Sequence, residues 1–156
     1  LHKRWEVHVK KGYMNFNEFY RECRDIIFDD SIERILHFRI TSRGNTVPSQ
    51  THPYLLSHSI RDLSKIDFTT TKPVVMMNGT LNITPESHLN DTMTYTKNVL
   101  YQYVDNIPHL LELLNNQVPR WAIVTTKKIY LTNNFIEEDG IFYSNLNHKD
   151  FYSYCT

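Results

Sequence analysis

The stretch "KPVVMMNGT", residues 72–80, decides the centre of the fold. Four consecutive apolar residues stand between Pro73 and the pair Asn78-Gly79. A short continuous apolar run bounded by turn-forming residues is typical of a buried strand, and Asn-Gly frequently forms a tight turn. We therefore expect a buried strand in this stretch, with a tight turn at its end.

The segments on either side of this run switch between strand-like and helix-like patterns. In chain order we expect a strand from residue 6 to about 11, a helix over 15–28, a strand over 34–42, the buried strand, helices over 90–106 and 107–116, a hairpin over 120–135 and a strand over 140–145. This order favours an α+β fold in which helices cover largely antiparallel sheets. No repeat or linker interrupts it, so we expect a single domain over residues 1–156.

Composition excludes several classes of partner. Lys plus Arg and Asp plus Glu both number 17, so no net charge favours nucleic acid or an anionic membrane. No apolar run approaches the roughly 20 residues that cross a bilayer. We expect neither a nucleic-acid nor a membrane partner.

Metal and cofactor signatures are also missing from the sequence. The eight histidines are scattered, the two cysteines Cys23 and Cys155 lie far apart, and no phosphate-binding or dinucleotide-binding motif occurs. We expect no metal and no cofactor, and the sparse cysteines suit a reducing compartment. Cys23 falls on the apolar stripe of the helix over 15–28, which favours a buried structural thiol over a nucleophile.

The predicted strand over 34–42 has two different faces. Alternation places two groups of side chains on opposite sides, namely Leu36, Phe38 and Ile40 on one and His37, Arg39 and Thr41 on the other. The guanidinium of Arg39 offers a planar fork of donors that matches a carboxylate, so Arg39 is a candidate for binding the carboxylate of an amino acid. The alternative is a structural ion pair.

Two further positions could carry chemistry. Asn78 and Gly79 could present an amide side chain and a backbone N–H to a developing oxyanion, although Asn-Gly is usually only a turn. Asp91 could receive the ammonium group of a bound amino acid, although Asp before a helix is more often an N-cap. Each signal is weak when taken singly.

The order of these signals is more specific than any one of them. The blocks "VHVKKGYMNFNEFY", "HFRITSRGNTVPSQTHPY", "VVMMNGTLN", "NDTMTYTKNVL" and "WAIVTTKKIYLTNNFIEEDGIFYSN" follow one another over nearly the whole chain. In this order they resemble the class II glutamine amidotransferase-like proteins of bacteriophages, which belong to the N-terminal-nucleophile (Ntn) hydrolase superfamily. The resemblance implies a four-layer αββα sandwich of antiparallel sheets.

The resemblance also implies roles for individual residues. Arg39 matches the arginine that holds the carboxylate of glutamine, and Asp91 matches the acid that receives its α-ammonium. Asn78 and Gly79 match the pair that forms the oxyanion hole. The implied reaction is hydrolysis of the glutamine side-chain amide, a glutaminase activity that passes ammonia to an acceptor.

The nucleophile implied by the resemblance is an N-terminal cysteine. The chain begins at Leu1, and neither Cys23 nor Cys155 matches that cysteine, so we expect the leading segment, including the first strand, to be missing. Two interpretations follow. The chain is either a structural or interaction module that binds another protein chain of the virion or host, or an active amidotransferase whose cysteine lies upstream. In both cases we expect a viral protein of the host cytoplasm or the virion.

Overall fold

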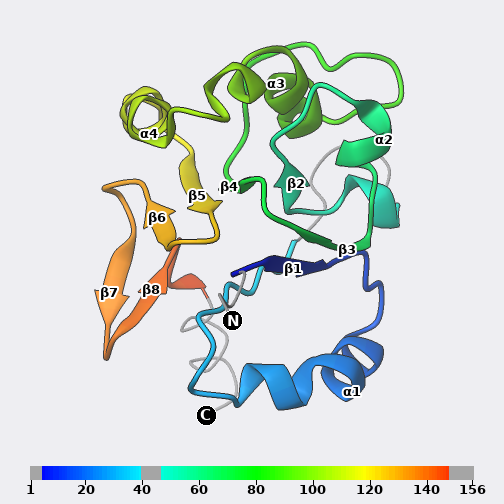
Figure 1. Cartoon of the computed structure of the whole chain (residues 1–156), viewed down its shortest axis with the longest axis vertical. Helices are drawn as coiled ribbons and strands as arrows, with labels where there is room; N and C mark the ends of the chain where they lie inside the picture. The colour runs from blue at the N-terminus through cyan, green and yellow to red at the C-terminus, as the bar shows by residue number, and fades with distance from the viewer. Residues whose placement is uncertain (1–4, 40–46, 148–156) are drawn as a thin grey trace.

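The computed structural model describes residues 5–39 and 47–147 (Figure 1). It is a mixed α+β fold with antiparallel sheets, as predicted. The elements in chain order are β1 (Val7–Lys10), α1 (Phe16–Ile27), η1 (Pro48–Gln50), β2 (Tyr54–Leu55), α2 (Ile60–Leu63), β3 (Asp67–Thr70), β4 (Val74–Asn78), α3 (Asp91–Asn98), η2 (Leu100–Tyr103), α4 (Ile107–Asn115), β5 (Arg120–Val124), β6 (Ile129–Leu131), β7 (Ile136–Glu138) and β8 (Ile141–Tyr143).

The predicted buried strand is β4, and it lies inside a four-stranded sheet of order β2-β4-β5-β6. Its first four residues are all buried, which confirms the prediction from the apolar run. β4 pairs with β2 on one side and with β5 on the other, both antiparallel. The expected hairpin over 120–135 is also present, as β5 and β6. The chain bends at Gly79 and then continues as a long loop to Asn90.

Two further pairs of strands flank this sheet. β1 pairs with β3 in antiparallel register, and the valines Val7 and Val9 of β1 pack with Leu55 and Val74 of the four-stranded sheet. β7 and β8 form a separate hairpin at one side of the molecule (Figure 1). β3 was not expected from the sequence.

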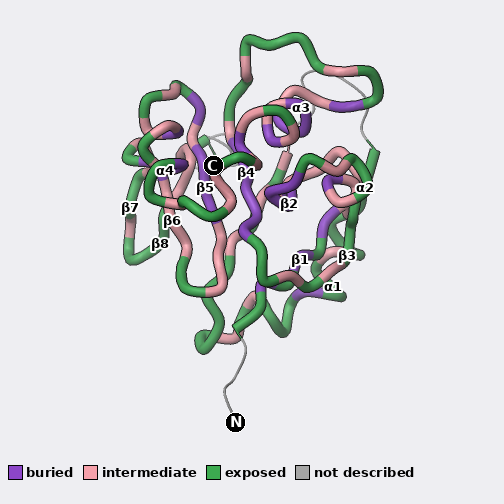
Figure 2. The backbone as a smooth tube through the Cα atoms, turned by 45° about the horizontal axis from the view of Figure 1, so that its top comes forward, coloured by how far each residue is buried: buried purple, intermediate pink, exposed green. Residues whose placement is uncertain are grey.

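The main core lies between the four-stranded sheet and the helices α2, α3 and α4. Its fully buried members include Tyr54, Met93, Leu110 and Trp121. Figure 2 shows the same concentration, with buried backbone along β2, β4, β5 and α3. The burial of these large side chains stabilises this half of the molecule.

α1 lies on the other side of the strands from these helices (Figure 1). It begins as predicted, because the side chain of Asn15 accepts hydrogen bonds from the backbone N–H groups of Asn17 and Glu18. Within α1, which the structure describes in full, Cys23 is the one buried residue, at 7% exposure. The predicted burial of Cys23 is confirmed, but most of the apolar stripe around it is not covered.

The predicted strand over 34–42 is wrong for the part that the structure describes. Residues 33–39, called the extended segment below, form neither helix nor strand. Residues 40–42 lie outside the described residues. The alternation itself holds, since His37 and Arg39 are half-buried while Leu36 and Phe38 are exposed. The described part is held by side-chain contacts and not by a backbone ladder, and period-two alternation cannot distinguish the two.

Candidate functional site

A cavity of about 1180 Å³ lies between α1 and the extended segment on one side and the sheets on the other. Its apolar wall includes Val9 of β1, Phe19 and Ile27 of α1, Met76 of β4 and Val124 of β5. Four nitrogen-bearing side chains of interest also line it: Lys11, His37, Arg39 and His52. Arg39, the sharpest candidate from the sequence, therefore does reach a cavity.

Arg39 contributes to a junction centred on one backbone carbonyl. Nη1 of Arg39 donates to the carbonyl oxygen of Gln50 at 3.1 Å. The Tyr54 hydroxyl and the Asn90 side-chain amide donate to the same oxygen at 2.6 and 3.0 Å. Gln50 is thus the point at which the extended segment, β2 and the start of α3 meet. Arg39 and Asn90, the neighbour of Asp91, thus share one acceptor.

Asp91 uses its carboxylate to hold backbone. One oxygen accepts from the N–H of Leu81 at 3.1 Å and the other from the N–H of Thr92 at 2.8 Å. The N-cap of α3 is Asn90, whose side chain accepts from Met93 N–H, and Asp91 is the first helical residue. The carboxylate of Asp91 therefore ties the loop after β4 to the start of α3.

Asn78 and Gly79 lie at the end of β4. The Asn78 amide donates to the Ser144 hydroxyl at 2.7 Å, so it contacts the segment after β8. Gly79 has a φ of 139°, and an added Cβ would come within 3.0 Å of Cβ of Pro119. Glycine is therefore required there by conformation and by space. Neither Asn78 nor Gly79 lines the cavity. The structure connects Arg39 to Asn90, the neighbour of Asp91, whereas the Asn78 amide is bonded to Ser144.

Lys11 is a buried cation that the sequence analysis missed. Its side chain donates from Nζ to the carbonyl oxygen of Leu63 at 3.0 Å and, less closely, to that of Ser49 at 3.4 Å. Nζ also lies 4.3 Å from the centre of the Tyr54 ring. Burial lowers the pKa of Lys11 to about 7, because an ammonium loses its hydration there. Lys11 is only 8% exposed.

Two histidines form a contact beside Lys11. Nδ1 of His52 and Nε2 of His37 are 3.0 Å apart, and the rings meet edge to face. Burial and the positive charge of Arg39 lower the pKa of His37 to about 4. Burial, followed by His37, Arg39 and Lys11, holds the pKa of His52 well below its usual value. Both rings are therefore neutral at pH 7.

Nε2 of His52 is closed to solvent and has no hydrogen-bond partner among the residues that the structure describes. A buried polar atom without a partner costs stability, so such atoms are rare unless something else satisfies them. No signal in the sequence distinguishes His52 from the other histidines, such as His58.

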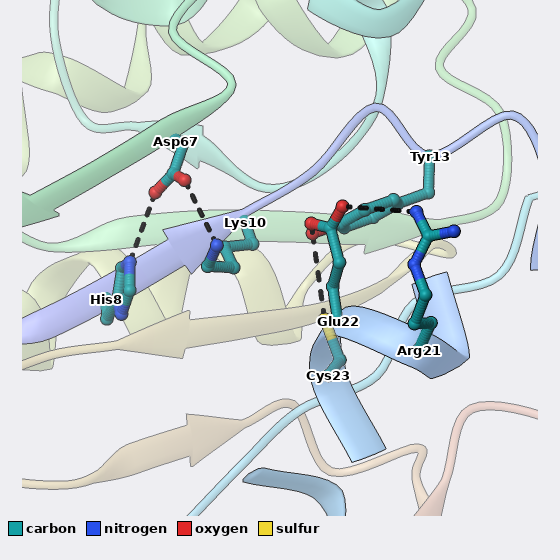
Figure 3. A network of polar contacts seen from close by, with 7 residues as sticks. All are labelled: His8, Lys10, Tyr13, Arg21, Glu22, Cys23 and Asp67. Atoms are coloured by element: carbon teal, nitrogen blue, oxygen red, sulfur yellow. Dashed lines mark hydrogen bonds and ion pairs between the residues drawn. The ribbon is translucent and has the colours of Figure 1, made fainter. Parts of the chain in front are cut away.

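Cys23 also lines the cavity, within the polar network that Figure 3 shows. Its thiol lies 3.8 Å from the hydroxyl of Tyr13, which in turn donates to Glu22 at 2.8 Å. Burial, followed by this hydrogen bond to Glu22, raises the pKa of Tyr13. Tyr13 therefore stays protonated at neutral pH and holds the thiol from β1's side of the cavity, which agrees with a structural role for Cys23. Cys155 lies outside the described residues.

Other chemistry finds no support in the described part of the chain. No group of three or more His, Cys, Asp or Glu side chains within residues 5–39 and 47–147 could hold a metal ion. None of the helices in these ranges is long and apolar enough to span a membrane. No protein-family model, curated protein or solved structure matches the chain.

Proposed function

We propose that the chain is a class II glutamine amidotransferase-like domain of a bacteriophage, working in the host cytoplasm or the virion as an interaction module that binds another protein chain. One observation carries this function. Phe16, Phe19, Tyr20 and Phe38 form an aromatic cluster on α1 and the extended segment, with neighbouring ring centres 5.5 to 6.4 Å apart. Phe16 and Phe38 are 63% and 65% exposed.

Exposed aromatic side chains that contact one another are uncommon on a protein that works alone, and they are typical of protein-binding surfaces. The remaining apolar residues of the same region add to this surface, among them Trp5, Phe28 and Leu36. The placement of helices on both sides of the strands supports the αββα sandwich as the architecture that presents it (Figure 1).

The aromatic cluster can be tested by photo-crosslinking in cells that make the protein. A photoreactive phenylalanine analogue at position 38 should give one discrete crosslinked product with another protein. The same analogue at position 142, an exposed phenylalanine of β8, serves as the matched control and should not. Absence of a product at position 38, or the same products at both positions, would contradict the interaction module.

A second function, binding and hydrolysis of glutamine, is favoured by the position of Arg39. Arg39 lines the cavity, and its guanidinium is joined through the Gln50 carbonyl to Asn90, next to Asp91. A carboxylate held by Arg39 and an ammonium held by Asp91 would suit an amino acid such as glutamine. The oxyanion hole of this reaction would be formed by Asn78 and Gly79, with Asn78 exchanging Ser144 for the substrate.

Glutamine should then raise the melting temperature of the wild-type chain, and Arg39→Lys should lose this effect because lysine lacks the planar fork. Arg61→Lys, on α2, is the control. Release of ammonia from glutamine, measured on the same samples, separates catalysis from binding. If glutamine shifts neither protein, the second function fails, whereas the aromatic cluster is unaffected.

A further inference from the structure

The wall of the cavity beside α1 is chemically mixed. Much of it is aliphatic and aromatic, with side chains from β1, α1, β4 and β5 among others. Lys11, His37, Arg39 and His52 also line it, and the other three all act electrostatically on His52, so the four lie in one part of the wall. A ligand that matched both parts of the wall would have an apolar body and one polar group.

The Lys11 ammonium has no acidic side chain among its contacts in the described part of the chain. The Lys11 ammonium donates to two neutral carbonyl groups, and burial alone accounts for its lowered pKa. After burial and His37, the groups that lower the pKa of His52 are Arg39 and Lys11, both of them basic. A buried cation without an acid is costly, and an anion bound beside it would offset that cost.

Glu6 and Glu33 line the cavity but are not among the groups that shift the pKa of Lys11 or His52. The Asp91 carboxylate acts on Tyr54, whose hydroxyl has a pKa raised by burial, so Tyr54 stays neutral. Asp91 itself is engaged by the backbone N–H groups of Leu81 and Thr92. It therefore does not neutralise Lys11 directly.

The unpartnered nitrogen of His52 gives an independent indication. His37 occupies Nδ1 of His52, and Nε2 has no partner in the described part of the chain. His52 itself forms part of the cavity wall. A ligand oxygen would then supply the hydrogen bond that this ring lacks.

We propose that Lys11 and His52 form the binding site for the oxyanion group, carboxylate or phosphate, of a molecule whose apolar body lies in the cavity. Ligand sites usually measure about 300–1,000 Å³, so a cavity of about 1180 Å³ suits a body much larger than a free amino acid. Arg39 and three rings of the aromatic cluster line the same cavity, but Lys11 and His52 belong to neither proposed function, so the inference rests on neither.

Calorimetric titration of the purified chain tests this site with three probes of equal length. Decanoate and decyl phosphate carry an oxyanion, and decanol carries none. We expect at least one of the two anions to bind, and the stronger one identifies the oxyanion. We expect decanol to bind at least about tenfold more weakly, since a charged hydrogen bond inside a protein is worth that much. Equal binding of decanol, or no binding of either anion, would overturn the proposal.

Two matched pairs of variants locate the site. Lys11→Met keeps the length of the side chain and removes an amine that is costly to bury, so the variant should fold. It should weaken the binding of the anion about tenfold or more. The control Lys97→Met, which removes a lysine of α3 that pairs with Glu86, should not weaken binding. His52→Gln should weaken binding and His58→Gln should not. Wild-type affinity in Lys11→Met would overturn the proposal.

The pH dependence of decanoate binding gives a third readout. Decanoate is ionised throughout, and the Lys11 ammonium is lost as the pH rises through about 7. Binding should therefore be several-fold tighter at pH 6.5 than at pH 8.5 in the wild type, with no such difference in Lys11→Met. The same affinity at both pH values in the wild type would contradict a role for the ammonium.

Discussion

The two faces of the strand layers differ in how they treat apolar side chains. On the face of α2, α3 and α4, large residues such as Trp121 and Leu110 are completely buried. On the face of α1, Phe16 and Phe38 remain mostly exposed, and a cavity separates the helix from the sheets. Apolar side chains on the first face stabilise the fold through burial, whereas those on the second face remain accessible to a ligand or a partner. Shortening a side chain in the half covered by α2, α3 and α4 should therefore destabilise the protein strongly, whereas shortening one on the α1 side should have little effect.

The largest effect is expected from Trp121→Ala. Trp121 has no exposed surface, and its indole N–H donates to Gln117 at 3.2 Å. The variant should lose about 3–5 kcal/mol of unfolding free energy, because it removes a large buried side chain and leaves a cavity. Urea denaturation measures this loss. A loss below about 1 kcal/mol would show that the helix-covered half is not the stable one.

The next effect concerns Lys11 and the pH of the solution. The pKa of Lys11 is about 7 when folded and 10.5 in its ordinary state, so the unfolded chain binds more protons between these values. Stability must then rise with pH, by about 2 kcal/mol from pH 7 to pH 9. Above pH 10 the raised pKa values of Tyr13 and Tyr54 act in the opposite direction.

Urea denaturation at both pH values checks this expectation for Lys11. In Lys11→Met the rise between pH 7 and pH 9 should disappear, and in Lys97→Met it should remain. A wild type whose stability is unchanged or falls over this range would mean that Lys11 is charged in the folded chain.

A smaller effect is expected from Asp91→Asn. The amide keeps one acceptor oxygen, so one of the two backbone N–H groups, from Leu81 or Thr92, loses a charged partner. We expect a cost of about 1–2 kcal/mol in unfolding free energy. Asp25→Asn, on the exposed side of α1, is the control. No loss for Asp91→Asn would indicate that its carboxylate is held for a ligand.

The smallest effect on stability is expected from the aromatic cluster. Phe16→Ser combined with Phe38→Ser should change the unfolding free energy by less than about 1 kcal/mol, because both rings are largely exposed already. The same double variant should abolish crosslinking at nearby positions of α1. A large loss of stability would remove the contrast between the two faces.

The sequence predicted those elements whose local pattern and packing agree. The apolar run of β4, the hairpin of β5 and β6 and the Asn15 cap of α1 were all identified, because turn and cap residues mark their ends. The α+β class followed from their order. The αββα sandwich and the amidotransferase roles of individual residues stay predictions.

Elements that depend on distant partners were missed or misassigned. β3 is only four residues long and has one half-buried face, so its pattern is too short to recognise, and it is held in place by pairing with β1. Residues 33–39 have good strand alternation but no ladder. Lys11 continues the period of Val7 and Val9, and its burial follows this parity, although a lysine is seldom buried.

The junction at Gln50 has a consequence for how the chain would vary. Arg39, Tyr54 and Asn90 all donate to the main-chain oxygen of residue 50, and any amino acid at that position supplies the same oxygen. The side chain of Gln50 donates to the carbonyl oxygen of His88. In a library of single substitutions, position 50 should therefore accept many amino acids, whereas positions 39, 54 and 90 should accept few.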